Sequence, residues 1–436
     1  EAWRFILFSE FVFDLPDAPP ESLAKVPKAD KAAMDLIYDL CDRLRDSQQA
    51  RETYVDHAHE VADELRLKTL TKEVEDLGDR DTFAFEERSF LRRFAETALS
   101  GDVGKADEIL RGHRDSIWVT AGGSAQDWEM ASRSLELLKT IEDFRRENAA
   151  FPSKLEELVD VYLATGRRID TLHREFHQAW EELDDEPAPE IRKLAEKVDA
   201  GYVELASDRV MAFTAAVTRE NWPPANMPSN REVFEKFVNP ALDKRERIAY
   251  LLVDSLRYEL ALGLQANLED SFECETSAVA AQLPTITPVG MASLMPDAKE
   301  KFALKERKGE LIPMIDEQPV VNPGDRLECL KKKLGDRVQM EKLDDFLQQG
   351  ENLNLAETVN LLVLRTTEID QAGETDPSLA LREIPRSLGK LKRAMRLLRE
   401  RGFRTAVVAT DHGFVLIEGP PSTGKKSAVR RLARDK

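Results

Sequence analysis

The sequence lacks several features that would assign it at once to a class of protein. It has only three cysteines, Cys41, Cys274 and Cys329, spaced too widely for a cysteine zinc ribbon or a disulfide framework. No apolar run approaches the roughly 20 residues that a membrane span needs, and no signal-peptide pattern is present. We therefore expect a protein of the reducing cytoplasm without a membrane partner.

The sequence also lacks an excess of positive charge. Lys and Arg total 63 against 82 Asp and Glu, a formal net charge of −19. A protein that wraps DNA non-specifically needs a basic surface, so the overall balance argues against that class. Basic residues do concentrate in 386–404 and in the tail 425–434. A local basic face and a solvated helix face both fit this pattern, so direct contact with DNA stays open.

The chain changes character near residue 220. Before that point apolar residues recur at spacings of three and four, as in Met34–Leu44 and Ser134–Phe144, which predicts amphipathic helices. The stretch 221–230 is rich in proline and asparagine and breaks every periodic pattern. The predicted organisation is a helical N-terminal module at 1–220, a linker at 221–230 and an α/β domain at 231–436.

Beyond the linker, strand-like and helical stretches alternate, which favours a mostly parallel sheet covered on both faces. The longest helix is expected at Leu379–Arg401. Strands are expected near residues 248–253, 272–280, 311–315, 337–340, 359–364 and 404–410.

Three aspartates sit at or just beyond the carboxyl ends of such strands. Asp254 and Asp411 end apolar runs, Asp370 follows a third run after a few polar residues, and His412 comes directly after Asp411. Ligands of open α/β sheets bind beyond the carboxyl ends of the strands. One such aspartate is usually a helix cap or turn former, but three together with a histidine predict ligands for a divalent metal.

Thr287 is the candidate nucleophile. It precedes Pro288, so it is expected as the N-cap of a helix whose first position is the proline. Free backbone N–H groups at a helix start favour bound phosphate, and a hydroxyl beside a metal can be activated for attack. The alternative is a capped helix without a chemical role.

His173 and His177 also lie on one helical face, at the spacing of zinc proteases. The glutamate that acts as general base in those enzymes does not follow the first histidine. We therefore expect a pair on a helix surface rather than a metal site.

Three segments together resemble the PglZ domain, a member of the alkaline phosphatase superfamily known from bacterial BREX anti-phage systems. They are Val253–Glu259, Leu283–Pro296 and Val408–Gly413. The helical first half is similar to the region that precedes this domain. The resemblance implies an alkaline-phosphatase-like α/β domain that is incomplete at its C-terminal end.

The resemblance also implies roles for individual residues. Asp254 matches the first metal-binding aspartate, and Asp411 and His412 would complete that site. Thr287 matches the nucleophile, which also coordinates the metal, with Thr285 as the alternative.

A second metal is in question. Asp370–Glu374 resembles a segment of related phosphodiesterases in which a histidine stands where Glu374 stands here. The last histidine of that second site would lie beyond residue 436. Asp370 and Glu374 are therefore candidate ligands of an altered second site, and one metal is expected.

These roles imply phosphoester hydrolysis through a phosphothreonine intermediate. Mixed Asp and His ligation favours zinc, with manganese and magnesium as alternatives. Arg257 lies one helical turn after Asp254 and is a candidate for binding the substrate phosphate; an exposed position or an ion pair with Glu259 is the alternative.

Two functions follow from the resemblance. The first is a metal-dependent phosphodiesterase or nuclease-like component of a BREX complex, acting on nucleotides or nucleic acid. The second is a phosphatase-like scaffold with little or no activity that docks other defence proteins. Other BREX proteins, including the methyltransferase, are the expected partners in both cases.

Overall fold

The structure is a computed structural model that describes residues 1–113, 116–121, 123–183 and 186–416, so the basic tail at 425–434 lies outside the described residues. The chain forms two compact units. The first comprises Glu1–Asp143 and Glu175–Tyr202, and the second comprises Phe144–Arg174 and Val203–Lys436. No helix among the described residues is long and apolar enough to cross a membrane.

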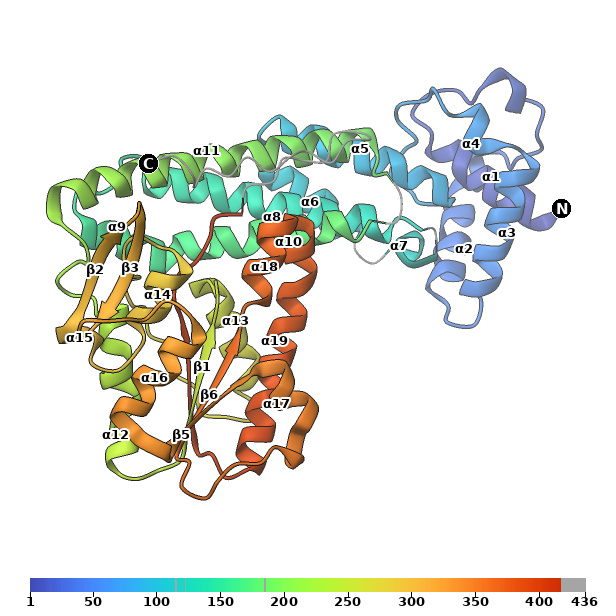
Figure 1. Cartoon of the computed structure of the whole chain (residues 1–436). Helices are drawn as coiled ribbons and strands as arrows, with labels where there is room; N and C mark the ends of the chain where they lie inside the picture. The colour runs from blue at the N-terminus through green and yellow to red at the C-terminus, as the bar shows by residue number, and fades with distance from the viewer. Residues whose placement is uncertain (114–115, 122, 184–185, 417–436) are drawn as a thin grey trace. The chain divides into compact units, whose positions relative to one another are not determined.

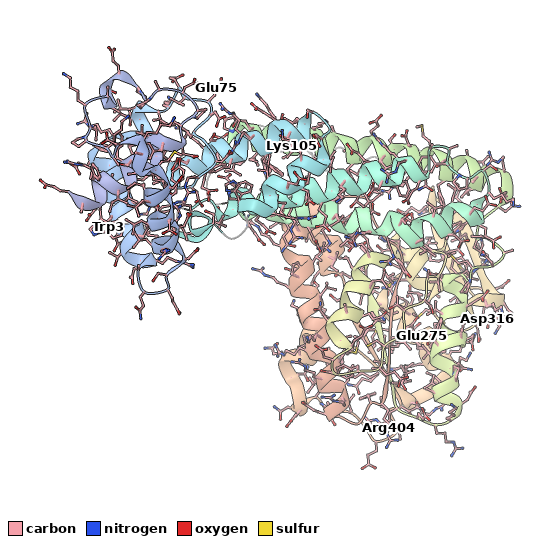
Figure 2. The ribbon with its side chains drawn as sticks, turned by 180° about the vertical axis from the view of Figure 1, so that it is seen from behind. Trp3, Glu75, Lys105, Glu275, Asp316 and Arg404 are labelled. Atoms are coloured by element: carbon pink, nitrogen blue, oxygen red, sulfur yellow. The ribbon has the colours of Figure 1, made fainter. Side chains whose placement is uncertain are left out.

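The N-terminal part of the chain is helical, as predicted. Its aromatic core includes Phe8, Phe11, Tyr54 and Trp118, all fully buried. Near the chain start, Trp3, which Figure 2 labels, stacks on the ring of His57 at 4.9 Å between centroids. The helices are α1 Ala2–Asp14, α2 Met34–Asp46, α3 Arg51–Glu64, α4 Leu67–Leu70, α5 Glu87–Leu99, α6 Val103–His113, α7 Ile117–Ala121, α8 Ala125–Glu147, α9 Leu155–Val161, α10 Arg167–Glu181 and α11 Pro189–Glu220.

A four-stranded parallel sheet forms the centre of the α/β region, with the strand order β5-β6-β1-β7. Every residue of the central strand β1 is buried, which explains why it reads as one continuous apolar run. The predicted mostly parallel sheet is thereby confirmed. The strands are β1 Ile248–Val253, β5 Val338–Lys342, β6 Leu361–Thr366 and β7 Thr405–Thr410.

Helices cover both faces of this sheet (Figure 1). The helices on one face are α12 Asn239–Asp243, α14 Thr287–Ser293 and α16 Pro323–Leu334. Those on the other are α13 Tyr258–Leu268, α17 Leu343–Gln349 and α19 Pro377–Glu400. Successive residues of a strand point to opposite faces, so Ile248 and Tyr250 belong to the first core and Ala249 and Leu251 to the second.

Two strand predictions were wrong or incomplete. Residues 272–280 form no strand, because among the described residues this segment pairs only through one bridge, Ser229 to Ala280. The expected strand at 311–315 is part of β3, which belongs to a separate antiparallel sheet and not to the parallel one. That sheet consists of β2 Phe302–Arg307, β3 Glu310–Ile315 and β4 Gln318–Pro319, and it follows the short helix α15 Ala298–Lys301.

The expected linker at 221–230 makes specific contacts within the second unit. The indole nitrogen of Trp222 donates to the carbonyl oxygen of Ala281 at 2.7 Å. The side chain of Asn230 is buried and donates to the carbonyl oxygen of Asp411 at 2.9 Å. The division into module, linker and α/β domain stays a prediction about independent folding units.

Candidate metal centre

The topology of the sheet brings the predicted metal ligands to one edge. Asp254 follows β1 directly, Asp411 and His412 follow β7, and Asp370 lies on α18 (Glu368–Thr375) just after β6. Carboxyl ends of parallel strands meet at the same edge of a sheet. Arg404, which precedes β7 and is labelled in Figure 2, marks the opposite edge.

Four of the predicted ligands lie within a few ångströms of one another. Asp254, Asp370 and His412 each offer one ligand atom, and these atoms all lie within 4.8 Å of each other. The Nε2 atom of His412 is 3.6 Å from Oδ1 of Asp254 and 3.3 Å from Oδ2 of Asp411. Oδ2 of Asp411 is buried and accepts no hydrogen bond within the described part of the chain. An unsatisfied buried carboxylate oxygen beside an imidazole is the kind of group that a cation would satisfy.

Thr287 faces this cluster. Its Oγ1 lies 3.2 Å from Nε2 of His412 and 3.5 Å from Oδ1 of Asp254. The helix begins at Thr287, and Ile286 is its N-cap residue. The prediction that Thr287 is the N-cap was therefore wrong, because Thr287 is the first residue of the helix. The hydroxyl is therefore directed at the ligands and not at its own helix. Thr285, the alternative nucleophile, is exposed and makes no hydrogen bond within the described residues.

A loop residue that sequence reasoning missed connects the ligands. Ser255 adopts φ +60°, a conformation uncommon outside glycine. Its backbone N–H donates to Oδ1 of Asp411 at 3.2 Å, and its hydroxyl donates to Oδ1 of Asp370 at 2.8 Å. The same hydroxyl lies 3.2 Å from Nδ1 of His412. Ser255 thus fixes the orientation of three candidate ligands at once.

Gly290 is a second missed residue. A Cβ at this position of α14 would lie 2.7 Å from Cβ of Asp411 and 2.8 Å from its carbonyl oxygen. No side chain fits there, so the absence of a Cβ lets α14 approach the loop after β7. Gly290 follows Thr287 by three residues and keeps the hydroxyl close to the aspartate.

The electrostatics of the cluster favour a bound cation. Burial, followed by the nearby Asp411 and Asp370, raises the pKa of Asp254 to about 8. Burial also raises the pKa of Asp411, although His412 opposes the shift. Carboxylates crowded together out of water cannot all stay charged unless a positive charge joins them. The oxygen and imidazole donors fit a hard or borderline divalent ion such as zinc, manganese or magnesium.

Comparison with known proteins agrees with this geometry. Residues 233–433 match the family model described as the BREX system PglZ alkaline phosphatase-like domain. The chain therefore contains a PglZ alkaline phosphatase-like domain at residues 233–433. The match includes every strand of the parallel sheet and all the candidate ligands. The alkaline-phosphatase-like fold suggests a divalent metal, and the groups that could bind one are present.

Two curated proteins are similar to this chain. The alkaline phosphatase-like protein PglZ of Bacillus cereus (strain H3081.97) is 27% identical over 234 residues, 52% of this chain and 27% of that protein. The alkaline phosphatase-like protein BrxZ of Escherichia coli O9:H4 (strain HS) is 23% identical over 275 residues, 60% of this chain and 31% of that protein. The chain thus matches less than a third of the length of either relative.

Two further predicted site residues, Glu374 and Arg257, are not among the grouped metal-ligand side chains. Glu374 is exposed on α18 and does not belong to the group of possible ligands. Arg257 is buried and forms ion pairs with Asp170 (3.4 Å) and Glu259 (3.7 Å). Of the roles considered for Arg257, the ion pair with Glu259 is the one that its contacts match. The metal role of Glu374 and the substrate role of Arg257 stay predictions.

The histidine pair of the helical region is not on the surface, so that expectation was wrong. His173 and His177 of α10 are both buried. They fall on the same side of the helix as Ile169, Leu172 and Phe176, which are buried as well. Nε2 of His177 lies 2.9 Å from Oδ1 of Asp199, a polar contact that compensates for burying the ring.

Proposed function

We propose that this PglZ domain protein is a metal-dependent phosphoesterase that cleaves phosphodiesters of nucleotides or nucleic acid. It would act in the cytoplasm as a component of a BREX phage-defence complex. The observation that carries the proposal is the position of the Thr287 hydroxyl, within 3.5 Å of both the His412 imidazole and an Asp254 carboxylate oxygen. Nucleophile and ligands converge there from three separate segments of the chain.

Asp254, Asp411 and His412, with Thr287 itself, would hold the metal, and Asp370 lies close enough to join them. Mixed carboxylate and imidazole donors make zinc our proposal for the ion. A divalent ion bound there would withdraw charge from a phosphoryl group and lower the pKa of the threonine hydroxyl.

The residues of the chain then supply the remaining chemistry. Oγ1 of Thr287 forms a bond to phosphorus, and the bond from phosphorus to the leaving oxygen breaks. Oδ1 of Asp254 is a carboxylate oxygen within reach of the hydroxyl proton, at 3.5 Å from Oγ1. The leaving oxygen takes a proton from solvent. Water then hydrolyses the phosphothreonine, which releases a phosphomonoester and restores Thr287.

One observation favours the alternative, a phosphatase-like scaffold with weak or no activity. Glu374, which stands in the place of a usual second-site histidine, is exposed and separate from the cluster. A scaffold would use the domain to dock other BREX proteins such as the methyltransferase. It would retain metal but hydrolyse no phosphoester.

Substitution of Thr287 separates the two functions. Thr287→Ala should abolish hydrolysis of bis-p-nitrophenyl phosphate by the metal-loaded protein, because it removes the attacking oxygen. Thr287→Ser should keep measurable activity, and Thr285→Ala is the matched control at the exposed threonine. An active Thr287→Ala enzyme would exclude the covalent route. Metal-loaded wild-type protein without activity on any phosphoester would favour the scaffold.

A further inference from the structure

An arginine of the parallel sheet points to the same face as the metal cluster. In β6, Leu361 and Val363 pack in the core that contains Ile248, Tyr250 and Leu252 of β1. Side chains alternate between faces, so Arg365 continues this row on β6 and Asp254 continues it on β1. Arg365 is in register with Leu252, two positions before Asp254. Both groups therefore lie on one face at the carboxyl end of the sheet.

A second arginine reaches the same place from α16. Arg326 lies in the first turn of this helix, in one row with Leu330 and Leu334, which pack in the same core. The helix leads through the short turn Gly335–Arg337 into the amino end of β5, so its own start lies toward the carboxyl end of the sheet. α16 packs against β5. Only 8% of Arg326 is exposed.

The two guanidinium groups are close enough to influence each other. Burial, followed by the charge of Arg365, lowers the pKa of Arg326, while Asp411, Asp254 and Asp325 oppose this shift. Within the described residues, Arg326 donates one hydrogen bond, from Nη1 to the carbonyl oxygen of Val321 at 3.4 Å, and Arg365 donates none. Neither forms an ion pair with a described residue.

Asp254, Asp325 and Asp411 attract Arg326 without forming an ion pair with it, so each guanidinium can still take a direct negative partner. Two like charges brought close together repel each other, and the donors of these arginines that bind no described residue remain available to a ligand. A phosphate group matches the planar fork of arginine and can satisfy both side chains. Arg257 is engaged differently, because its ion pairs with Asp170 and Glu259 already supply its negative partners.

We propose that Arg326 and Arg365 form the anion-binding side of the metal centre and bind the phosphate group of the substrate. The proposal rests on the proposed phosphoesterase function and deepens it, since it assigns recognition of the substrate's negative charge to two residues outside the resemblance motifs. The metal ligands and Thr287 would act on the phosphorus, and the arginines would hold its non-bridging oxygens.

Phosphate binding to the metal-loaded full chain tests the proposal without relying on turnover. Arg326→Met and Arg365→Met keep much of the side-chain volume and remove the charge. Each should weaken the binding of inorganic phosphate by at least about tenfold, as measured by titration calorimetry, because a charge-assisted hydrogen bond is lost. Arg396→Met, at an exposed arginine of α19, is the matched control and should bind phosphate like the wild type. Metal content should equal that of the wild type in all three variants.

Several outcomes would overturn the proposal. These are unchanged phosphate affinity in both variants, loss of metal in parallel with loss of phosphate, and wild-type protein that binds no phosphate. Because Arg365 is only half-buried, Arg365→Met is expected to fold, and its phosphate affinity tests the proposal if Arg326→Met fails to fold. Wild-type protein that binds phosphate through the arginines but hydrolyses no phosphoester would refute the proposed hydrolysis alone. If the wild-type protein hydrolyses phosphoesters and both arginine variants bind phosphate as tightly as the wild type, only this inference is refuted.

Discussion

Replacing Asp170 by asparagine should lower the stability of the second compact unit by about 3 kcal/mol at pH 7. Asp170 is buried, and its Oδ1 accepts a hydrogen bond from Nη2 of Arg209 at 2.7 Å. Its Oδ2 lies 3.4 Å from Nη2 of Arg257 and accepts a hydrogen bond from the hydroxyl of Tyr162 at 3.1 Å. Asparagine keeps the shape and one acceptor oxygen, but it leaves the buried guanidinium of Arg257 and the half-buried guanidinium of Arg209 with a neutral partner.

The magnitude follows from the asymmetry of buried ion pairs. Removal of one partner typically costs about 3–5 kcal/mol, because the remaining charge is left uncompensated. We take the lower end, since Glu259 still pairs with Arg257 at 3.7 Å and asparagine can still accept from Arg209. For a unit of this size the loss corresponds to a fall in Tm of roughly 6–12 °C. Differential scanning calorimetry of the full chain should show it in one transition.

The effect should depend on pH in a defined direction. Burial alone would raise the pKa of Asp170, but Arg209 and Arg257 hold it below its usual value. A carboxyl whose folded pKa is depressed contributes stability above its unfolded pKa of about 3.9 and loses that contribution as pH falls further. The difference in Tm between wild type and Asp170→Asn should therefore be full at pH 7 and narrow below about pH 4.

A matched substitution isolates the buried contacts. Asp160→Asn changes the same charge at an exposed position of α9 and should shift stability by less than about 0.5 kcal/mol. Equal Tm values for Asp170→Asn and wild type at pH 7 would refute the reasoning. They would mean that the cost of desolvating the carboxylate cancels its attraction to the two arginines.

The remaining predictions concern the metal centre and the domain division. Asp411→Ala should reduce the metal content of the full chain as measured by elemental analysis, and equal content in the variant and the wild type would refute the ligand assignment. Gly290→Ala should lower stability by about 1–3 kcal/mol and weaken metal binding, because its Cβ collides with Asp411; Gly263→Ala, in α13 with open space around the position, should not. Limited proteolysis should cut first within 221–230 if the helical module and the α/β domain fold independently, and protection of that stretch would contradict the division.

The parallel sheet could be predicted because its strands are buried on both faces. Burial on both sides produces unbroken apolar runs, such as Ile248–Val253 and Leu361–Leu364, and polar residues follow them. The stretch 272–280 was predicted as a strand, and its side chains are alternately half-buried and exposed over residues 272–278. It forms no ladder because strand pairing depends on a neighbour that a local pattern does not reveal. The two types of segment look alike in sequence and differ only in tertiary contacts.

The metal ligands could be predicted for a related reason. Each of them stands at or near the end of a recognisable strand, and the rule that parallel strands end at one edge then brings Asp254, Asp411 and His412 together. Residues that support the ligands carry no such local mark. Ser255 matters through its positive φ and its hydrogen bonds to Asp370 and Asp411, and Gly290 matters through the space that it leaves beside Asp411. Both depend on segments that are distant in the chain.

The arginines show most clearly why proximity in sequence misleads. Arg257 was a candidate for binding phosphate because it follows Asp254 by one helical turn, yet α10 supplies Asp170 as its partner. Its guanidinium also lies 5.0 Å from the centre of the Phe414 ring, which follows the Asp-His-Gly motif. Arg257 thus stabilises the loop that carries His412. Arg326 and Arg365 come from elements without a recognisable motif, but helix row and strand register place them near the carboxylates. An arginine beside the site is informative about substrate only where the fold has left it without an ion-pair partner, and the sequence does not show which arginines those are.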